Sequence, residues 1–91
     1  MKREQVYELH SLSKKLKIPN QLFRVLVANS MVLTGAYKDQ TKEDEAFEIS
    51  VKALNKANPN SFIRSGKLDY NVYLYGKQLV QETIKEKQAH R

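Results

Sequence analysis

The feature that most constrains how this chain can fold is a segment with almost no polar side, residues 20–34, which reads NQLFRVLVANSMVLT. Pro19 precedes the segment and Gly35 follows it, and these residue types favour the start and the end of a helix. A helix that is apolar nearly all round is buried on more than one side. In a chain of 91 residues, such a helix is expected to be central, to form a subunit interface, or to do both.

Two further segments show the spacing of amphipathic helices. Residues 3–16 form one apolar stripe at three- and four-residue intervals, namely Val6, Leu9, Leu12 and Leu16. Residues 41–58 begin with Thr-Lys-Glu-Asp, which resembles a capping box with Thr41 as the N-cap residue. The residues of this segment expected to face inward are Phe47, Val51, Leu54 and Ala57. Pro59 ends the segment, and a loop is expected from Asn60 to Lys67.

The last segment combines two periodicities. The stretch LDYNVYLYG alternates apolar residues from Leu68 to Leu74, which suits a strand. Val72, Tyr75 and Leu79, however, follow helical spacing into a plainly helical tail, and nothing else in the chain offers a partner strand. We therefore expect a helix over residues 69–87. The predicted fold is all-α, a single small domain over residues 1–91 with four helices and a central, nearly all-apolar second helix.

Composition argues against several functional classes. The chain has no cysteine, only 2 histidines and no glycine-rich phosphate loop, so no catalytic residue, metal site or cofactor is expected. The N-terminal sequence lacks the apolar core of a signal peptide. The run from Leu22 to Ala36 is too short and too polar to span a bilayer, which takes about 20 mostly apolar residues. We therefore expect a soluble, cytoplasmic protein that is not an enzyme and does not contact a membrane.

The placement of charge favours a polyanionic partner. Residues 1–38 carry seven basic and two acidic side chains, and residues 49–91 carry eight basic and three acidic ones. Residues 39–48, which we call the acidic decade, carry five acidic side chains and one basic side chain. A chain of this kind can present a basic face to DNA and keep an acidic patch elsewhere. The alternative is a lysine-rich surface that only serves solubility.

The basic stretch before Pro19 fits a helix-turn-helix. In that motif the first helix presents a small residue where a short turn sets the recognition helix across it. With Ser13 as the small residue, the offsets expected to be apolar are occupied by Leu12, Leu16, Ile18, Phe23 and Leu26. Two features count against the motif. Lys17 occupies the turn position that usually takes glycine, where a left-handed conformation costs lysine roughly 1 kcal/mol, and the second helix is too apolar to lie in a groove beyond its first turn.

Six residues around this turn are the candidate DNA-binding residues. Three are lysines expected to contact phosphates, which supplies affinity without sequence choice. The other three lie near the start of the second helix, where Asn and Gln suit adenine and Arg suits guanine or phosphate. The six residues are Lys14, Lys15, Lys17, Asn20, Gln21 and Arg24.

The same region resembles a known family. The stretch PNQLFRVLVANSM resembles the Pro-Asn, three residues, Arg, five residues, Ser, apolar pattern of the small E subunit of bacterial DNA phosphorothioation (Dnd) systems, and GKLDYNVYLYG is similar to that family's glycine-to-Leu-x-Gly segment. The matching residues are Pro19, Asn20, Arg24, Ser30, Met31, Gly66, Leu74 and Gly76. The Thr-Gly that this family has before Pro-Asn is absent here. The resemblance implies a small helical, oligomeric, DNA-binding accessory protein with no catalytic site of its own.

A second functional class stays open. The chain could be a protein-protein interaction module, such as a phage- or plasmid-type adaptor or inhibitor, or a structural subunit of a larger complex. In that case the apolar helix and the tyrosines at 70, 73 and 75 are the working surface, although core packing is the favoured role of these tyrosines. Because so short a chain buries a limited core, a homo-oligomer is also expected. The expected oligomer interface residues are Leu22, Val25, Met31 and Tyr73.

Overall fold

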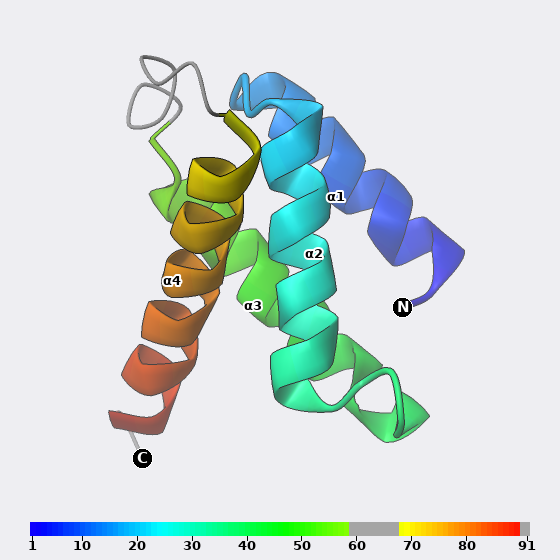
Figure 1. The fold of residues 1–91 in the computed structure, drawn as a ribbon. Helices are drawn as coiled ribbons and strands as arrows, with labels where there is room; N and C mark the ends of the chain where they lie inside the picture. The colour runs from blue at the N-terminus through cyan, green and yellow to red at the C-terminus, as the bar shows by residue number, and fades with distance from the viewer. Residues whose placement is uncertain (59–67, 90–91) are drawn as a thin grey trace.

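The chain forms an all-α domain, as the sequence predicts. A computed structural model describes residues 1–58 and 68–89, and Figure 1 shows their arrangement. The helices are α1 (Arg3–Lys15), α2 (Asn20–Thr34), α3 (Glu43–Lys56) and α4 (Leu68–Ala89), with a short 3-10 helix, η1 (Gln40–Lys42), before α3. The described residues contain no strand, so the alternating segment 68–75 is helical. Pro59 and the loop expected over residues 60–67 lie outside the described residues.

Successive helices run in opposite directions along the bundle. From the N-terminus α1 leads to one end of the molecule, α2 returns from it, α3 leads back towards that end, and α4 returns again (Figure 1). As a result, α2 and α4 run in the same direction and begin at the same end of the bundle. The second helix contacts α1, α3 and α4, which confirms the prediction that it is central.

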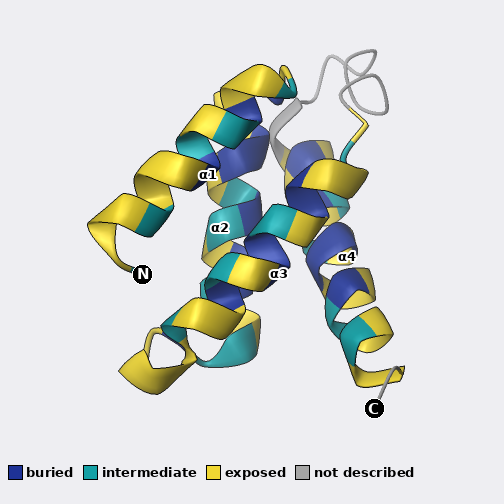
Figure 2. Cartoon of the chain, turned by 180° about the vertical axis from the view of Figure 1, so that it is seen from behind, coloured by how far each residue is buried: buried dark blue, intermediate teal, exposed yellow. Residues whose placement is uncertain are grey.

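The buried faces of the helices meet between α2, α3 and α4, with α1 covering one side (Figure 2). The buried apolar cluster consists of Leu9, Ile18, Leu22, Phe23, Leu26, Ile49, Ala53, Leu54, Val72, Leu79 and Val80. On α3 the buried row is displaced from the predicted one, because Phe47 and Val51 are only half-buried while Ile49 and Ala53 are fully buried. The displacement arises because α3 packs against three helices at once. Val6 of the predicted α1 stripe is exposed.

Helices α2 and α4 approach each other closely at Gly76. A Cβ atom placed on Gly76 would lie 2.5 Å from Cγ1 of Val25 and 3.4 Å from Cδ1 of Leu22. Carbon atoms that are not bonded to each other prefer a separation of about 3.5–4.0 Å, so a side chain on Gly76 would force the two helices apart or Val25 out of its place. The absence of a side chain at this position therefore sets the spacing between the two helices.

Five buried polar side chains form hydrogen bonds within their own helices. Asn29, Ser30, Ser50 and Thr83 each donate to the carbonyl oxygen four residues earlier, over 2.7 to 2.9 Å. The Ser13 hydroxyl donates to the carbonyl oxygen three residues earlier at 2.9 Å. A buried polar group left without a partner would cost about 1–3 kcal/mol, and among the described residues no buried side-chain nitrogen or oxygen lacks one. These polar side chains are therefore compatible with the core.

The prediction that Thr41 caps the third helix is wrong. The Asp39 carboxylate accepts hydrogen bonds from the Thr41 hydroxyl at 2.7 Å and from the Thr41 N–H at 3.1 Å. The hydroxyl bond, followed by the N–H bond, holds the pKa of Asp39 below its ordinary value. An ionised carboxylate is a stronger acceptor than a hydroxyl, so Asp39 caps η1, and α3 begins only at Glu43.

Replacing Gly76 by alanine is expected to destabilise the domain by about 1–3 kcal/mol, because the added methyl group overlaps Val25. Urea denaturation measures the change in the free energy of unfolding. Gln78→Ala, at an exposed position of the same helix, is the matched control and should change stability by less than about 0.5 kcal/mol. Val25→Ala should restore part of the loss when combined with Gly76→Ala. Strictly additive losses in the double variant would contradict the contact.

Candidate nucleic-acid interface

The corner between α1 and α2 is made by a left-handed lysine. Lys17 has a φ of 60°, the one positive φ of a non-glycine residue in the described part of the chain. Its N–H donates to the carbonyl of Lys14 at 3.1 Å, and the N–H of Ile18 donates to the carbonyl of Ser13 at 2.8 Å. This pair of bonds is the Schellman arrangement, in which glycine is the usual left-handed residue. The end of α2 has the same arrangement with Gly35 at a φ of 79°.

The residues around the corner are buried in the pattern that the sequence predicts. Ser13, the small residue at the crossing, is 3% exposed. His10 contacts Phe23 edge-on across the two helices, with ring centroids 5.5 Å apart. Of the predicted apolar positions, the buried ones are Ile18, Phe23 and Leu26, and the half-buried ones are Leu12 and Leu16. The turn is therefore held by packing on its inner side.

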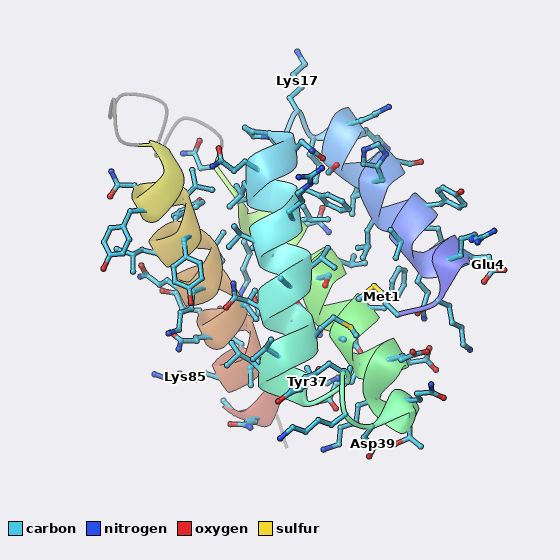
Figure 3. All side chains as sticks on the ribbon, turned by 45° about the vertical axis from the view of Figure 1, so that its right-hand side comes forward. Met1, Glu4, Lys17, Tyr37, Asp39 and Lys85 are labelled. Carbon is cyan, nitrogen blue, oxygen red and sulfur yellow. The ribbon has the colours of Figure 1, made fainter. Side chains whose placement is uncertain are left out.

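All six candidate DNA-binding residues are exposed. Lys17 extends away from the end of the bundle, beyond both helices (Figure 3). Lys14 and Lys15 occupy the last turn of α1, and Asn20, Gln21 and Arg24 occupy the first two turns of α2. The structure thus brings the two predicted groups together at one end of the molecule.

The exposed stripe of α2 changes character along the helix. In the first two turns its exposed residues are Asn20, Gln21 and Arg24, whereas Ala28 and Val32 follow on the same face. The apolar residues that count against a groove-binding helix are mostly directed inwards, since Leu22, Phe23 and Leu26 are buried. The polar part of the stripe, about two turns long, is the part that can contact base edges.

The corner carries four basic side chains that are close together in the sequence. Lys14, Lys15, Lys17 and Arg24 are its four basic residues, and no acidic residue occurs in the sequence between Glu8 and Asp39. Within the described residues, none of these four side chains takes part in an ion pair. We call these four residues the basic corner.

The lysines between α3 and α4 are paired instead. The Glu48 carboxylate accepts Lys87 at 3.0 Å and Lys52 at 3.2 Å, and Lys56 pairs with Glu86. The hydrogen bond from Lys87, followed by that from Lys52, holds the pKa of Glu48 below its ordinary value. Pairing reduces the net charge of this face, whereas the four side chains of the basic corner form no ion pair with other described residues.

The acidic decade lies at the opposite end of α1. The Gln5 amide donates to Asp44 at 2.8 Å, and the N-terminal amino group donates to Glu43 at 3.2 Å. Asp39 and Lys17 lie at opposite ends of the bundle (Figure 3). The acidic decade, which also contains Lys42, therefore lies away from the basic corner and does not neutralise it.

The structure contradicts part of the predicted oligomer interface. Leu22 is fully buried and Val25 is half-buried against Gly76. Their apolar surface is used within one chain, because α2 packs on α4. Met31 is half-buried, and only Tyr73 is exposed.

The tyrosine cluster divides into an outer pair and an inner residue. Tyr70 is 68% exposed and Tyr73 is 44% exposed, so the prediction of core packing is wrong for both. Tyr75 is half-buried, and its hydroxyl accepts the N–H of Asn58 at 2.7 Å. The signal for this division is helical spacing, because residues three apart share a face and residues two apart do not.

Other kinds of site find little support. In residues 1–58 and 68–89, no group of three His, Cys, Asp or Glu side chains is placed to hold a metal ion. A shallow cleft of about 320 Å³ is lined by Leu33, Gln81, Ile84 and Lys85, which provide a single charged group. No helix in the described part of the chain has the length and apolar character needed to cross a bilayer.

Comparison with known proteins gives no assignment, because no family model, curated protein or solved structure matches this chain. Function is therefore inferred from the basic corner and its surroundings.

Lys17→Gly is expected to raise the free energy of unfolding by about 0.5–1 kcal/mol, because glycine adopts a left-handed conformation without steric cost. Urea denaturation provides the measurement. Lys15→Gly removes the same charge from a helical position and should lower stability by about 1 kcal/mol. A loss of stability in Lys17→Gly would contradict the left-handed assignment.

Glu48 is expected to contribute to acid sensitivity. A carboxylate whose pKa is lower in the folded than in the unfolded state stabilises the fold above the unfolded pKa, and that contribution is lost as the pH falls through the folded pKa. Because the pair is half-exposed, the loss between neutral pH and about pH 3 should be a few tenths of a kcal/mol. Urea denaturation at both pH values measures the pH-dependent loss of stability. The share due to Glu48 should be missing in Glu48→Gln and retained in Glu8→Gln. Equal pH dependence in Glu48→Gln and the parent would refute it.

Proposed function

We propose that this chain is a non-enzymatic, cytoplasmic DNA-binding protein that contacts the phosphate backbone through its basic corner. What supports this function most directly is a set of four exposed cations around the start of α2 that form no ion pair with other described residues, namely Lys14, Lys15, Lys17 and Arg24. The N-terminus of a helix carries partial positive charge, and α2 has no acidic residue in its first turn to offset it. Phosphate contacts of this kind supply affinity that does not depend on sequence.

Sequence preference would come from the first two turns of α2. Asn20, Gln21 and Arg24 are exposed there, and these side chain types match the hydrogen-bonding edges of adenine and guanine in the major groove. Beyond them Ala28 and Val32 offer only apolar contact. The base-reading element is therefore short, and most of the affinity comes from phosphates.

The resemblance to the E subunit of phosphorothioation systems points to an accessory role in an oligomer. Two of its matching residues, Asn20 and Arg24, are exposed at the proposed interface, while Ser30 and Gly76 are buried in the bundle. On this reading the exposed pair contacts DNA and the buried pair preserves the packing of α2. A preference for a nicked over an intact duplex would favour this role, and a preference for one sequence would favour a helix-turn-helix regulator.

A protein-interaction module is the second candidate. Val32, Leu33 and Tyr37 are exposed at the far end of α2, close in sequence to the acidic decade, and such a surface suits a basic, partly apolar protein. In this case the basic corner would be dispensable for binding.

Fluorescence anisotropy with a labelled duplex, titrated at several salt concentrations, tests the proposal. The variant K14Q/K15Q/K17Q should lose about tenfold or more in affinity near 50 mM salt, and the slope of log affinity against log salt should fall by about one for each phosphate contact removed.

The control variant K38Q/K42Q/K52Q removes the same charge from exposed lysines near the acidic decade. It should lose less than about threefold, through long-range attraction alone. Absence of duplex binding in the parent protein at about 50 mM salt, or an equal loss in both variants, would overturn the proposal and direct the search to protein partners.

A further inference from the structure

Two tyrosines on α4 are exposed and lie outside the buried apolar cluster. Tyr70 is 68% exposed and Tyr73 is 44% exposed, and their spacing of three residues places them on one face of the helix. Gly76, three residues further on, is the point of contact with α2. The row formed by residues 70, 73 and 76 therefore leads along α4 towards α2.

The tyrosine pair lies at the level of the base-reading turns of α2. Gly76 contacts Val25, and the two helices start at the same end of the bundle (Figure 1). Tyr73 precedes Gly76 by the three residues that separate Leu22 from Val25, a rise of about 4.5 Å on either helix. Tyr73 is thus level with residue 22, between Gln21 and Arg24 along the axis.

The surroundings of the pair favour an anion. Between Tyr70 and Gln81 the sequence of α4 contains no acidic residue, although Asp69 directly precedes the segment. The ammonium of Lys77 lies 6.0 Å from the centroid of the Tyr73 ring, and Lys77 takes part in no ion pair among the described residues. An aromatic face beside an unpaired cation is the combination that binds single-stranded nucleic acid.

We infer that Tyr70 and Tyr73 form a stacking site for unpaired bases, so that the chain binds nucleic acid containing a single-stranded segment. The inference deepens the proposed function and rests on it, because the basic corner supplies the phosphate contacts and lies at the end of the bundle where α4 begins (Figure 1). In a duplex, the base faces are covered by neighbouring bases, so an exposed tyrosine ring cannot stack on them and adds little affinity for a duplex. Stacking on an unpaired base is worth about 1–3 kcal/mol and tolerates any sequence.

The test compares the affinities of labelled oligothymidylate of about 16 nucleotides and of a duplex of the same length by fluorescence anisotropy. The variant Y70A/Y73A should lose about thirtyfold or more in affinity for the single strand, which corresponds to two stacked bases at the lower end of the range for each. Its affinity for the duplex should change by less than about twofold, since the basic corner is intact.

Two controls isolate stacking from other effects. Y70F/Y73F keeps the rings and should keep the affinity for the single strand. Y7A/Y37A removes two other exposed tyrosines, 65% and 57% exposed, that lie outside this surface, and it should bind the single strand as the parent does. Unchanged single-strand affinity in Y70A/Y73A, or an equal loss in Y7A/Y37A, would overturn the inference.

The outcomes separate this inference from the proposed function. If K14Q/K15Q/K17Q loses duplex binding while Y70A/Y73A binds the single strand normally, the basic corner stands and the stacking site falls. If the parent binds only the single strand and the tyrosine variant loses that binding, the stacking site stands and the duplex function falls. If the parent binds neither nucleic acid at about 50 mM salt, both are overturned.

Discussion

The contact of Val25 and Leu22 with the bare backbone of Gly76 determines how this domain is arranged. It holds α2 directly against α4, while α3 and α1 cover other sides of α2. One stripe of α2 stays exposed as a result, and its first turns carry Asn20, Gln21 and Arg24. The same contact fixes Tyr73 at the level of these residues. The lack of a side chain on Gly76 thus sets the relative positions of the proposed binding surfaces on α2 and α4.

Helix positions were largely readable from the sequence because the signals that end helices are local. Pro19 and Gly35 bracket the second helix at the residues where α2 starts and stops. The predicted start of the third helix was wrong because both Asp39 and Thr41 can act as an N-cap residue. Asp39 takes this role for η1, and its carboxylate accepts a hydrogen bond from the Thr41 hydroxyl. Residues 68–75 alternate apolar and polar side chains but form a helix, and the described residues offer no strand with which they could pair. Whether a partner strand exists depends on the rest of the chain and not on the segment itself.

The direction that each side chain faces was harder to predict than the helices themselves. In a helix that is apolar nearly all round, periodicity does not show which residue contacts a neighbouring helix. Leu22 was therefore assigned to a subunit interface although it is buried within the chain. The exposure of the six residues at the α1–α2 corner was easier to predict, because a sharp turn exposes the polar residues that flank it. The left-handed conformation of Lys17 follows from the turn and not from the preference of lysine.

The basic corner and the acidic decade lie at opposite ends of the bundle (Figure 3), so a polyanion interacts differently with the two ends. The longest dimension of the bundle is 39 Å, several times the screening length of about 8 Å at physiological ionic strength. In dilute salt, the field of a polyanion would reach both ends and favour an approach by the basic end, as the proposed function requires. At physiological salt each end responds only to charges in its own vicinity. The orientation in which the protein approaches a polyanion should therefore depend on the ionic strength of the buffer as well as on the charges of the protein.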